Sequence, residues 1–121
     1  MKQDPTKRNI FVLNEEDHSL QLILEPLRWE GYDVKGFTSY DQFSEALRFM
    51  RPHMVIIDPE LAHKDGVFIV NELIPALEGC SVVIVSPDST TEKITQYLDL
   101  GANDFISSPF VPLEFLARVR N

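Results

Sequence analysis

Residues with oxygen-bearing side chains follow directly after several short apolar runs of this 121-residue chain. In chain order they are residues 14–17 (Asn-Glu-Glu-Asp), Asp58, Ser86 and the pair Ser107–Ser108. Two carboxylates and a hydroxyl group held close together would form an oxygen-rich site for a hard cation such as Mg²⁺. A carboxylate beside such a cation can also attack phosphorus and form an aspartyl phosphate. The chemistry therefore depends on whether the fold brings these residues together.

Five β-type runs alternate with helical patterns along the chain. The runs cover residues 10–13, 32–37, 54–57, 81–85 and 104–106. The segments between them carry apolar residues at the spacing of an amphipathic helix, in stripes that begin at Leu20, Phe43, Val70, Ile94 and Leu113. This alternation predicts an α/β fold, a doubly wound five-stranded parallel sheet with helices on both faces. Ligands of such sheets bind at the carboxyl ends of the strands, where the polar residues above would lie.

Local signals indicate where several helices begin and end. Ser39 and Ser89 are each followed three residues later by Gln or Glu, which is the capping-box pattern of a helix start. Pro26 and Pro75 lie inside helical patterns, where each removes a backbone N–H and crowds the preceding turn. We therefore expect a kink or an early end near each proline.

Composition limits the classes of protein to which the chain can belong. A length of 121 residues with 44% hydrophobic content suits one domain, residues 9–121, after a flexible leader at 1–8. The net charge of −8 disfavours nucleic-acid binding, and the longest aliphatic run, 82–85, is too short to span a membrane. The single Cys80 allows no internal disulfide and suits the reducing cytoplasm. The last helical pattern stops early at Asn121, as expected for a truncated helix of a longer parent chain.

Several stretches carry a resemblance to a known family. The sequence is similar to the receiver domain of two-component response regulators over residues 9–120, in order and at the family's spacing. The matching stretches are residues 10–16, 30–34, 54–58, 65–66, 81–86 and 101–110. The resemblance implies a flavodoxin-like fold with strand order 2-1-3-4-5 and a role in signal transduction through a phosphorelay.

The resemblance implies a role for most of the polar strand-end residues. Asp58 takes the phosphoacceptor position, and its phosphoryl donor would be a histidine kinase. Glu15 and Asn14 take the acidic positions that bind Mg²⁺ in the family. The backbone carbonyl of Glu60 would also reach the metal, while its N–H would reach the phosphoryl group. Ser86 would bind a phosphoryl oxygen and draw its loop inward.

The resemblance also implies features away from the acceptor. Phe105 takes the position of an aromatic rotamer switch, and the Ser108–Pro109 peptide bond is expected to be cis. Some family members form homodimers through a charged face of the last two helices and the last strand. The residues that partly match this face are Asp104, Glu114 and Arg118. Homodimerisation is therefore a hypothesis, and a solvated charged face is the alternative.

Five departures from the family pattern fall on the implied phosphoryl site. Ser108 stands where the family has a lysine, which removes a cation from beside a dianionic phosphoryl group. Pro59 and Pro87 stand where the family donates backbone N–H groups to the phosphoryl group, and proline has none to donate. Asn14 lacks the negative charge of an acid, and Glu15 places its carboxylate one methylene further out than aspartate would.

These departures favour a domain that signals by binding partners, with phosphorylation absent or weak. The alternative is a conventional Mg²⁺-dependent phosphoaspartate switch. In both cases the domain would relay a signal to a partner or an attached output domain. It would not be an enzyme beyond self-catalysed phosphoryl transfer to Asp58. A remote third hypothesis is a small-ligand binder of the flavin kind, although the three acids in the stretch 14–17 would repel a flavin phosphate.

No other motif in the sequence indicates a catalytic or metal site. The patterns GxxxxGK[ST], GxGxxG, GxSxG and HExxH do not occur, which leaves nucleotide-binding, esterase and zinc-protease chemistry unsupported. His18, His53 and His63 have no metal-site spacing with Cys80. We expect Cys80 to be a small core residue and Trp29 to pack at the end of the first helix.

Overall fold

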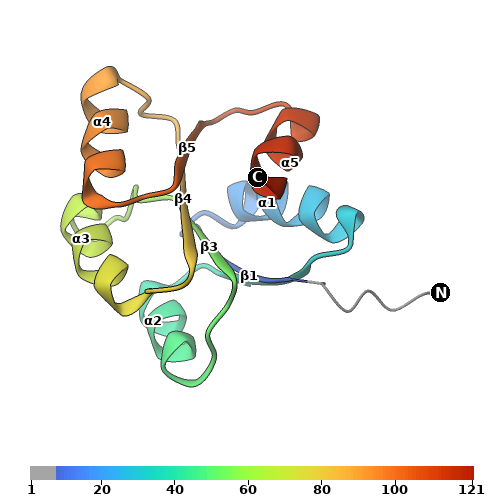
Figure 1. The fold of residues 1–121 in the computed structure, drawn as a ribbon, viewed down its shortest axis with the longest axis horizontal. Coiled ribbons are helices and arrows are strands. Elements are labelled where there is room, and N and C mark those ends of the chain that lie inside the picture. The colour runs from blue at the N-terminus through green and yellow to red at the C-terminus, as the bar shows by residue number, and fades with distance from the viewer. Residues whose placement is uncertain (1–7) are drawn as a thin grey trace.

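The computed structural model describes residues 8–121 of the chain, which form a five-stranded parallel sheet with flanking helices (Figure 1). The strands are β1 (Asn9–Leu13), β2 (Asp33–Phe37), β3 (Met54–Ile57), β4 (Ser81–Ser86) and β5 (Asp104–Ser107). Their spatial order is β2-β1-β3-β4-β5, which confirms the predicted order. The predicted leader, residues 1–8, lies outside the described residues except for Arg8, whose carbonyl accepts the N–H of Asp33 at 3.0 Å.

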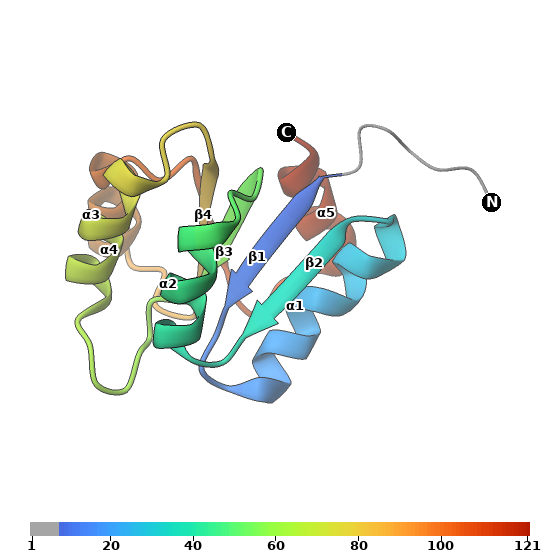
Figure 2. The same cartoon turned by 90° about the horizontal axis from the view of Figure 1, so that it is seen from below.

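Helices cover both faces of the sheet. The described residues form α1 (Asp17–Glu30), α2 (Tyr40–Phe49), α3 (Gly66–Ala76), α4 (Thr91–Leu100) and α5 (Pro112–Arg120). Figures 1 and 2 show α1 and α5 on one face and α2, α3 and α4 on the other. This arrangement confirms the predicted doubly wound α/β fold, because each connection between parallel strands returns across the sheet through a helix.

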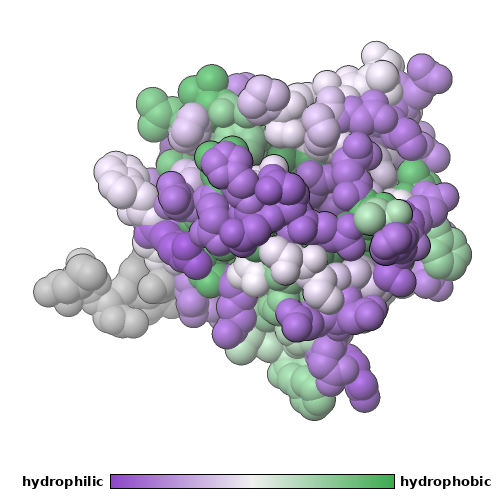
Figure 3. All heavy atoms as spheres, turned by 180° about the vertical axis from the view of Figure 1, so that it is seen from behind, coloured by the Kyte–Doolittle hydropathy of each residue, from purple (hydrophilic) through white to green (hydrophobic). Residues whose placement is uncertain are grey.

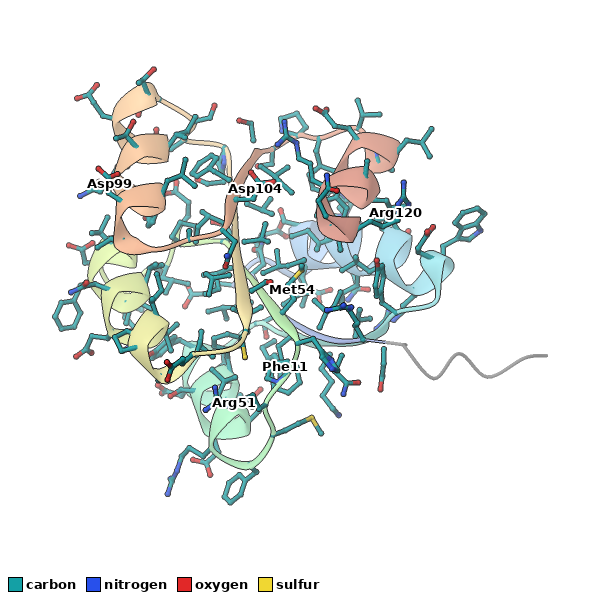
Figure 4. All side chains as sticks on the ribbon, viewed as in Figure 1. Phe11, Arg51, Met54, Asp99, Asp104 and Arg120 are labelled. Carbon is teal, nitrogen blue, oxygen red and sulfur yellow. The ribbon has the colours of Figure 1, made fainter. Side chains whose placement is uncertain are left out.

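Alternate residues of the central strands enter two separate hydrophobic cores. In β1, Ile10 and Val12 belong to the core beneath α1 and α5, which also contains Leu27 and Phe115. Phe11 points to the other face and lies between the sheet and α2 (Figure 4). Because side chains of a strand alternate between faces, a strand covered on both sides is apolar throughout. This double burial explains the continuous apolar sequence of β1.

Two helix starts test the predicted caps. Ser39 Oγ accepts the N–H of Gln42 at 3.2 Å and begins α2, as predicted. The cap of α4 is Thr90 rather than Ser89, and its hydroxyl accepts the N–H of Lys93 at 3.2 Å. Either hydroxyl is a suitable cap, so the conformation of the loop after β4 decides between the two neighbours.

The two helical prolines differ in their effect. Pro75 is the penultimate residue of α3, which ends at Ala76, so the expected early end is found there. Helix α1 does not end at Pro26 but continues to Glu30. Leu27, which follows this proline, is fully buried and anchors the last turn of α1 in the core.

Some apolar residues that the sequence assigns to buried helix faces are exposed. Trp29 is 83% exposed, so the prediction that it packs at the end of α1 is wrong. Leu113 is 77% exposed, and α5 instead buries Phe115, Leu116 and Val119. Figure 3 shows apolar side chains only in separate patches on a largely hydrophilic face. Among residues 8–121, no helix combines the length and the apolar character needed to cross a membrane.

Candidate functional site

The register of the parallel strands brings the predicted polar residues to one edge of the sheet. Leu13 pairs with Ile57, so Asn14 and Asp58 leave neighbouring strands side by side, and Ser86 ends the next strand. Within the described part of the chain, the buried polar residues are Asn14 and Ser86. Because a polar group is costly to bury unless it is hydrogen-bonded, these positions mark the edge as a region of specific polar contacts.

Asp58 accepts a hydrogen bond on each carboxylate oxygen. Its Oδ1 accepts the backbone N–H of Glu60 at 2.9 Å, and its Oδ2 accepts the side-chain amide of Asn14 at 3.2 Å. Its own N–H donates to the carbonyl of Leu13 at 2.9 Å, which extends the β1–β3 ladder to the site. The ends of β1 and β3 thus fix the orientation of this carboxylate.

Burial raises the pKa of Asp58 from its ordinary value of 3.8 to about 6. The hydrogen bonds from Glu60 and Asn14 favour the charged carboxylate and lower the pKa, while the negative charge of Glu60 raises it. Loss of hydration is the largest of these effects, so the carboxyl group ionises close to neutral pH. At pH 7 Asp58 is mostly an ionised and unusually basic carboxylate.

The residues after β1 are held by hydrogen bonds to nearby backbone. Asn14 Oδ1 accepts the N–H of Glu16 at 2.9 Å, so its NH₂ group faces Asp58. Glu15 Oε1 accepts the N–H of Ala62 at 2.7 Å, which ties the end of β1 to the loop after β3. Of the predicted metal-binding side chains besides Asp58 itself, Asn14 therefore presents an amide nitrogen to Asp58, and Glu15 accepts a backbone N–H.

Glu16 occupies the amino end of α1. Its Oε2 accepts the N–H of His18 at 3.0 Å, and its Oε1 accepts the N–H and the hydroxyl of Ser19 at 2.9 and 2.7 Å. Hydrogen bonds from Ser19 lower the pKa of Glu16. The backbone N–H groups that a helix leaves free at this end are thus already bound to a carboxylate of the chain itself.

Ser86 and Ser108 link the ends of β4 and β5. The carbonyl of Ser86 accepts the N–H of Ser108 at 3.0 Å, and Ser86 Oγ accepts the N–H of Asp88 at 3.1 Å. The Ser108–Pro109 peptide bond is cis, as predicted. Pro87 has no N–H, and the N–H of Ser108 is already used, so this side of the edge presents few donors to the acceptor position.

Phe105 is directed into the core. It is 8% exposed, and its ring centroid lies 6.2 Å from that of Tyr97, which is also buried. Burial raises the pKa of Tyr97 to about 12, with smaller contributions from nearby carboxylates. The Tyr97 hydroxyl therefore stays un-ionised at neutral pH, and its ring packs from α4 against Phe105 of β5.

A cavity of about 350 Å³ opens beside Asp58, and the sequence does not predict it. Asn14, Ser19 and Ser108 supply the rest of its polar lining, and the other lining residues are apolar. These segments lie far apart in the sequence and meet only in the folded chain. The one signal in the sequence is Ser108, because its short side chain replaces the longer lysine of the resemblance.

Comparison with known proteins decides the family. A family model of the response regulator receiver domain matches residues 10–120. The chain belongs to this family. The regulatory protein VirG of Agrobacterium tumefaciens is 33% identical over 122 aligned residues, which cover 99% of this chain and 45% of VirG. The DNA-binding response regulator MtrA of Mycolicibacterium smegmatis is 29% identical over 117 residues, which cover 97% of this chain and 51% of MtrA.

Solved receiver domains share the fold of this one. The BeF3-activated DrrB receiver domain superposes with a TM-score of 0.84 at 24% identity, over 95% of this chain and 96% of that chain. The chemotaxis response regulator CheY4 of Vibrio cholerae gives a TM-score of 0.84 at 16% identity, over 95% and 98% of the two chains. This receiver domain spans about half the length of the curated relatives it matches.

The receiver domain offers oxygen ligands around Asp58 without a preformed acidic cluster. Within residues 8–121, no group of three or more His, Cys, Asp or Glu side chains is placed to hold a metal ion. The carboxylates of Asp58 and Glu15 and the carbonyl of Glu60 are nevertheless the hard oxygen donors that Mg²⁺ prefers. The type of donor therefore fits Mg²⁺, although the carboxylate of Glu15 also accepts the N–H of Ala62.

The charged residues of β5 and α5 pair within the receiver domain. Arg118 lies 3.4 Å from Asp104 and 3.7 Å from Glu114. Figure 4 shows Asp104 on β5, between α4 and α5. The side chains of these pairs are partly exposed, so each pair contributes about 0–1 kcal/mol. The predicted dimer residues are therefore close together and already satisfy one another.

Proposed function

We propose that this receiver domain is a two-component signalling module that acts by binding partners, with Asp58 phosphorylated weakly or not at all. The observation that supports the proposal is the depleted set of donors around Asp58. Pro59 and Pro87 stand at two positions where the family pattern donates an N–H, and Ser108 stands at the lysine position. A phosphoryl group on Asp58 would therefore meet two N–H groups and one cation fewer than the family pattern provides.

The remaining contacts stabilise a phosphoryl group less. Glu60 retains an N–H directed at Asp58, and Ser86 retains its hydroxyl. Losing one oxyanion-type donor costs on the order of 3 kcal/mol in enzymes. Such losses do not simply add within one compact site. A single full loss nevertheless corresponds to a rate lower by about 100-fold.

A conventional phosphoaspartate switch is the second candidate, and the hydrogen bonds on the β1–β3 side of the site support it. Asp58 would attack the phosphorus of a phosphohistidine, forming an O–P bond as the N–P bond to the imidazole breaks. Glu60 N–H and the Ser86 hydroxyl would donate to the transferred phosphoryl oxygens. Bound Mg²⁺, held by Asp58, Glu15 and the Glu60 carbonyl, would supply positive charge.

In either case we propose a cytoplasmic domain that receives a signal from one protein and passes it to another. The input would be a histidine kinase or another signalling protein. The output would be a partner or a domain of the same parent chain, as in the relative named a DNA-binding response regulator. The receiver domain itself, with a net charge of −8, would not bind nucleic acid.

We further propose homodimerisation through the charged face of Asp104, Glu114 and Arg118 as an accessory property. Arg118 pairs with both acids within one chain, and a dimer would exchange these contacts for equivalent contacts with a second copy. Analytical ultracentrifugation tests this point, because a monomer at high protein concentration would reject it.

Intact-mass spectrometry after incubation with Mg²⁺ and acetyl phosphate tests the main proposal. Wild type is compared with Asp58→Asn, which cannot accept a phosphoryl group, and with Ser108→Lys, which restores the missing cation. We expect little mass gain for wild type, none for Asp58→Asn, and phosphorylation about 10- to 100-fold faster for Ser108→Lys. Wild type that gains one phosphoryl group as fast as an ordinary receiver in the same buffer would establish the conventional switch instead.

A further inference from the structure

The cavity beside Asp58 combines a single charged group with apolar walls. Its apolar lining comes from α1, the end of β4 and the β5–α5 loop, and includes Leu22, Ile23, Val85, Pro87, Pro109 and Phe110. Its volume of about 350 Å³ lies within the range of small-molecule sites. The shape and lining therefore suit a compact organic ligand rather than a bare ion.

The polar end of the cavity accepts hydrogen bonds and carries negative charge. Of the described residues that line it, Asp58 is the one that ionises. Asp58 accepts one hydrogen bond from Glu60 and one from Asn14, which leaves further lone pairs on both carboxylate oxygens. Since the lining contains no Lys, Arg or His, nothing in it would neutralise an anionic ligand.

The amino end of α1 does not make the cavity favourable for an anionic ligand. Ser19 lines the cavity, but the carboxylate of Glu16 already accepts the N–H groups of His18 and Ser19. Glu16 also adds a negative charge at this end of the helix, where an anion would otherwise be stabilised. An anionic ligand would therefore meet an occupied helix end, whereas a cationic ligand would meet favourable charge.

The apolar walls are firmly supported. Phe110 stacks on the fully buried Phe115, with ring centroids 4.6 Å apart. Ile23 and Val85 are buried, and Leu22 is 53% exposed, so this residue borders both the cavity and solvent. A hydrocarbon or aromatic group placed between these residues would lose contact with water, which favours binding.

We propose that this cavity binds a small amphipathic amine, with its ammonium group on Asp58 and its apolar body against Leu22, Val85 and Phe110. The ammonium group would stand beside Ser108, at the position where the family pattern has a lysine. The ligand thus supplies from solution the cation that the chain lacks. Binding to the free carboxylate requires no phosphoryl transfer, so the proposal holds whether or not Asp58 can also accept a phosphoryl group.

Titration of the 121-residue chain with three probes in Mg²⁺-free buffer, followed by amide NMR shifts, tests the proposal. Benzylamine, benzyl alcohol and benzoate share an aromatic ring and differ in carrying a positive, no or a negative charge. We expect benzylamine to bind at least about tenfold more tightly than benzoate, because only the ammonium forms a charge-assisted bond. The shifts should centre on the N–H groups of Glu60 and Ser108 and the side-chain amide of Asn14. Asp58→Asn should remove the preference for the cation.

Two lysine variants form a matched pair. Ser108→Lys places an ammonium group and a long side chain inside the cavity and should weaken benzylamine binding by about tenfold or more. Ser107→Lys adds the same side chain at the exposed neighbouring residue, which does not line the cavity, and should change affinity by less than about twofold. Leu22→Trp, which narrows the cavity from α1, replaces Ser108→Lys if the spectrum of that variant shows loss of fold.

Three results would overturn the proposal. The first is benzoate binding as tightly as benzylamine, and the second is no saturable benzylamine binding at millimolar concentration. The third is equal benzylamine affinity in Ser108→Lys and Ser107→Lys. The extent of phosphorylation in the mass experiment alters none of these results, so the phosphorylation and amine-binding proposals fail separately.

Discussion

Asp58 follows β3, and its two sides differ in the hydrogen-bond donors that the neighbouring strand ends present to its carboxylate. On the β1–β3 side, Asn14 and Glu60 donate hydrogen bonds to its two carboxylate oxygens at 3.2 and 2.9 Å. On the β4–β5 side, Pro87 has no N–H, Ser108 donates its N–H to a backbone carbonyl, and a cavity opens. One side of the carboxylate is thus fixed by donors, and the other side is left to whatever enters the cavity.

This difference shows that the backbone at the edge of a sheet can keep its hydrogen bonds whichever side chains surround the site. The hydrogen bond between the Ser86 carbonyl and the Ser108 N–H uses main-chain atoms, so it does not depend on which side chains these residues carry. The side chains decide whether the space beside the acceptor holds a cation, a donor or neither. The receiver fold therefore does not depend on which side chains line the β4–β5 side of the site.

The largest expected effect comes from removing the support of the cavity wall on the β4–β5 side. Phe115, in α5, is fully buried and stacks on Phe110. Phe115→Ala should lower the free energy of unfolding by about 3–5 kcal/mol, measured by urea denaturation, because it leaves a void. Leu113→Ala, at a 77% exposed position of the same helix, should change it by less than about 0.5 kcal/mol. A loss below about 1 kcal/mol for Phe115→Ala would mean that the wall is loosely packed.

The second prediction concerns the unfolding free energy that is lost when the partly buried carboxyl group of Asp58 ionises. Asp58 has a pKa of about 6 in the folded protein and an ordinary value of 3.8. The folded state therefore binds the proton more tightly, and this stabilisation is complete below about pH 4 and is lost as the pH rises through about 6. Because Asp58 is only partly buried, solvent screens its charge, and wild type should lose about 1–2 kcal/mol relative to Asp58→Asn between about pH 4 and pH 7. Parallel pH profiles of unfolding free energy for the two proteins would show that Asp58 is not desolvated.

A third variant disturbs the β1–β3 side through its backbone. A Cβ atom at Gly66 would clash with the carbonyl oxygen of Pro59, which follows Asp58. Gly66→Ala should destabilise the domain by about 1–3 kcal/mol and shift the Glu60 N–H signal in NMR. Gly36→Ala is the control, because its nearest contact is a flexible methyl end of Leu24 and costs less to move. Equal losses of unfolding free energy in Gly66→Ala and Gly36→Ala would show that the loop after β3 can shift at little energetic cost.

The smallest effect concerns the loop that leaves β4. Thr90→Ala removes the hydroxyl that accepts the N–H of Lys93 and should cost about 1 kcal/mol in thermal or urea unfolding. Ser89→Ala should be almost neutral, because the structure makes Thr90 the cap. A larger loss of stability for Ser89→Ala than for Thr90→Ala would show that Ser89 caps α4.

The apolar pattern predicts element type better than it predicts helix faces, and the strand order comes from the resemblance to the receiver family. Periodic apolar residues indicate that one face of a helix is buried, but a terminal turn has few neighbours to decide its direction. Trp29 and Leu113 lie in such terminal turns, and both are exposed. Ser89 and Thr90 carry similar hydroxyl groups, so local chemistry alone does not choose the cap of α4.

The sequence predicts which residues lie in the site, but it does not predict the hydrogen bonds that these residues form. The rule that ligands gather at the carboxyl ends of parallel strands places Asn14, Asp58 and Ser86 at one edge. No local pattern indicates that Glu15 accepts the N–H of Ala62, because that contact depends on how two loops meet. The cavity is equally hidden, since its walls come from segments at opposite ends of the chain.

Pro59 and Pro87 also limit how the edge around Asp58 can move. Each ring fixes its own φ near about −65°. Each also confines the residue before it, Asp58 or Ser86, to extended conformations. The two loops that would change position in a switch therefore start with fewer accessible backbone states. The backbone at Asp58 and Ser86 is therefore more restricted than it would be without the two prolines, so a bound ligand is expected to reorient side chains here more than main chain.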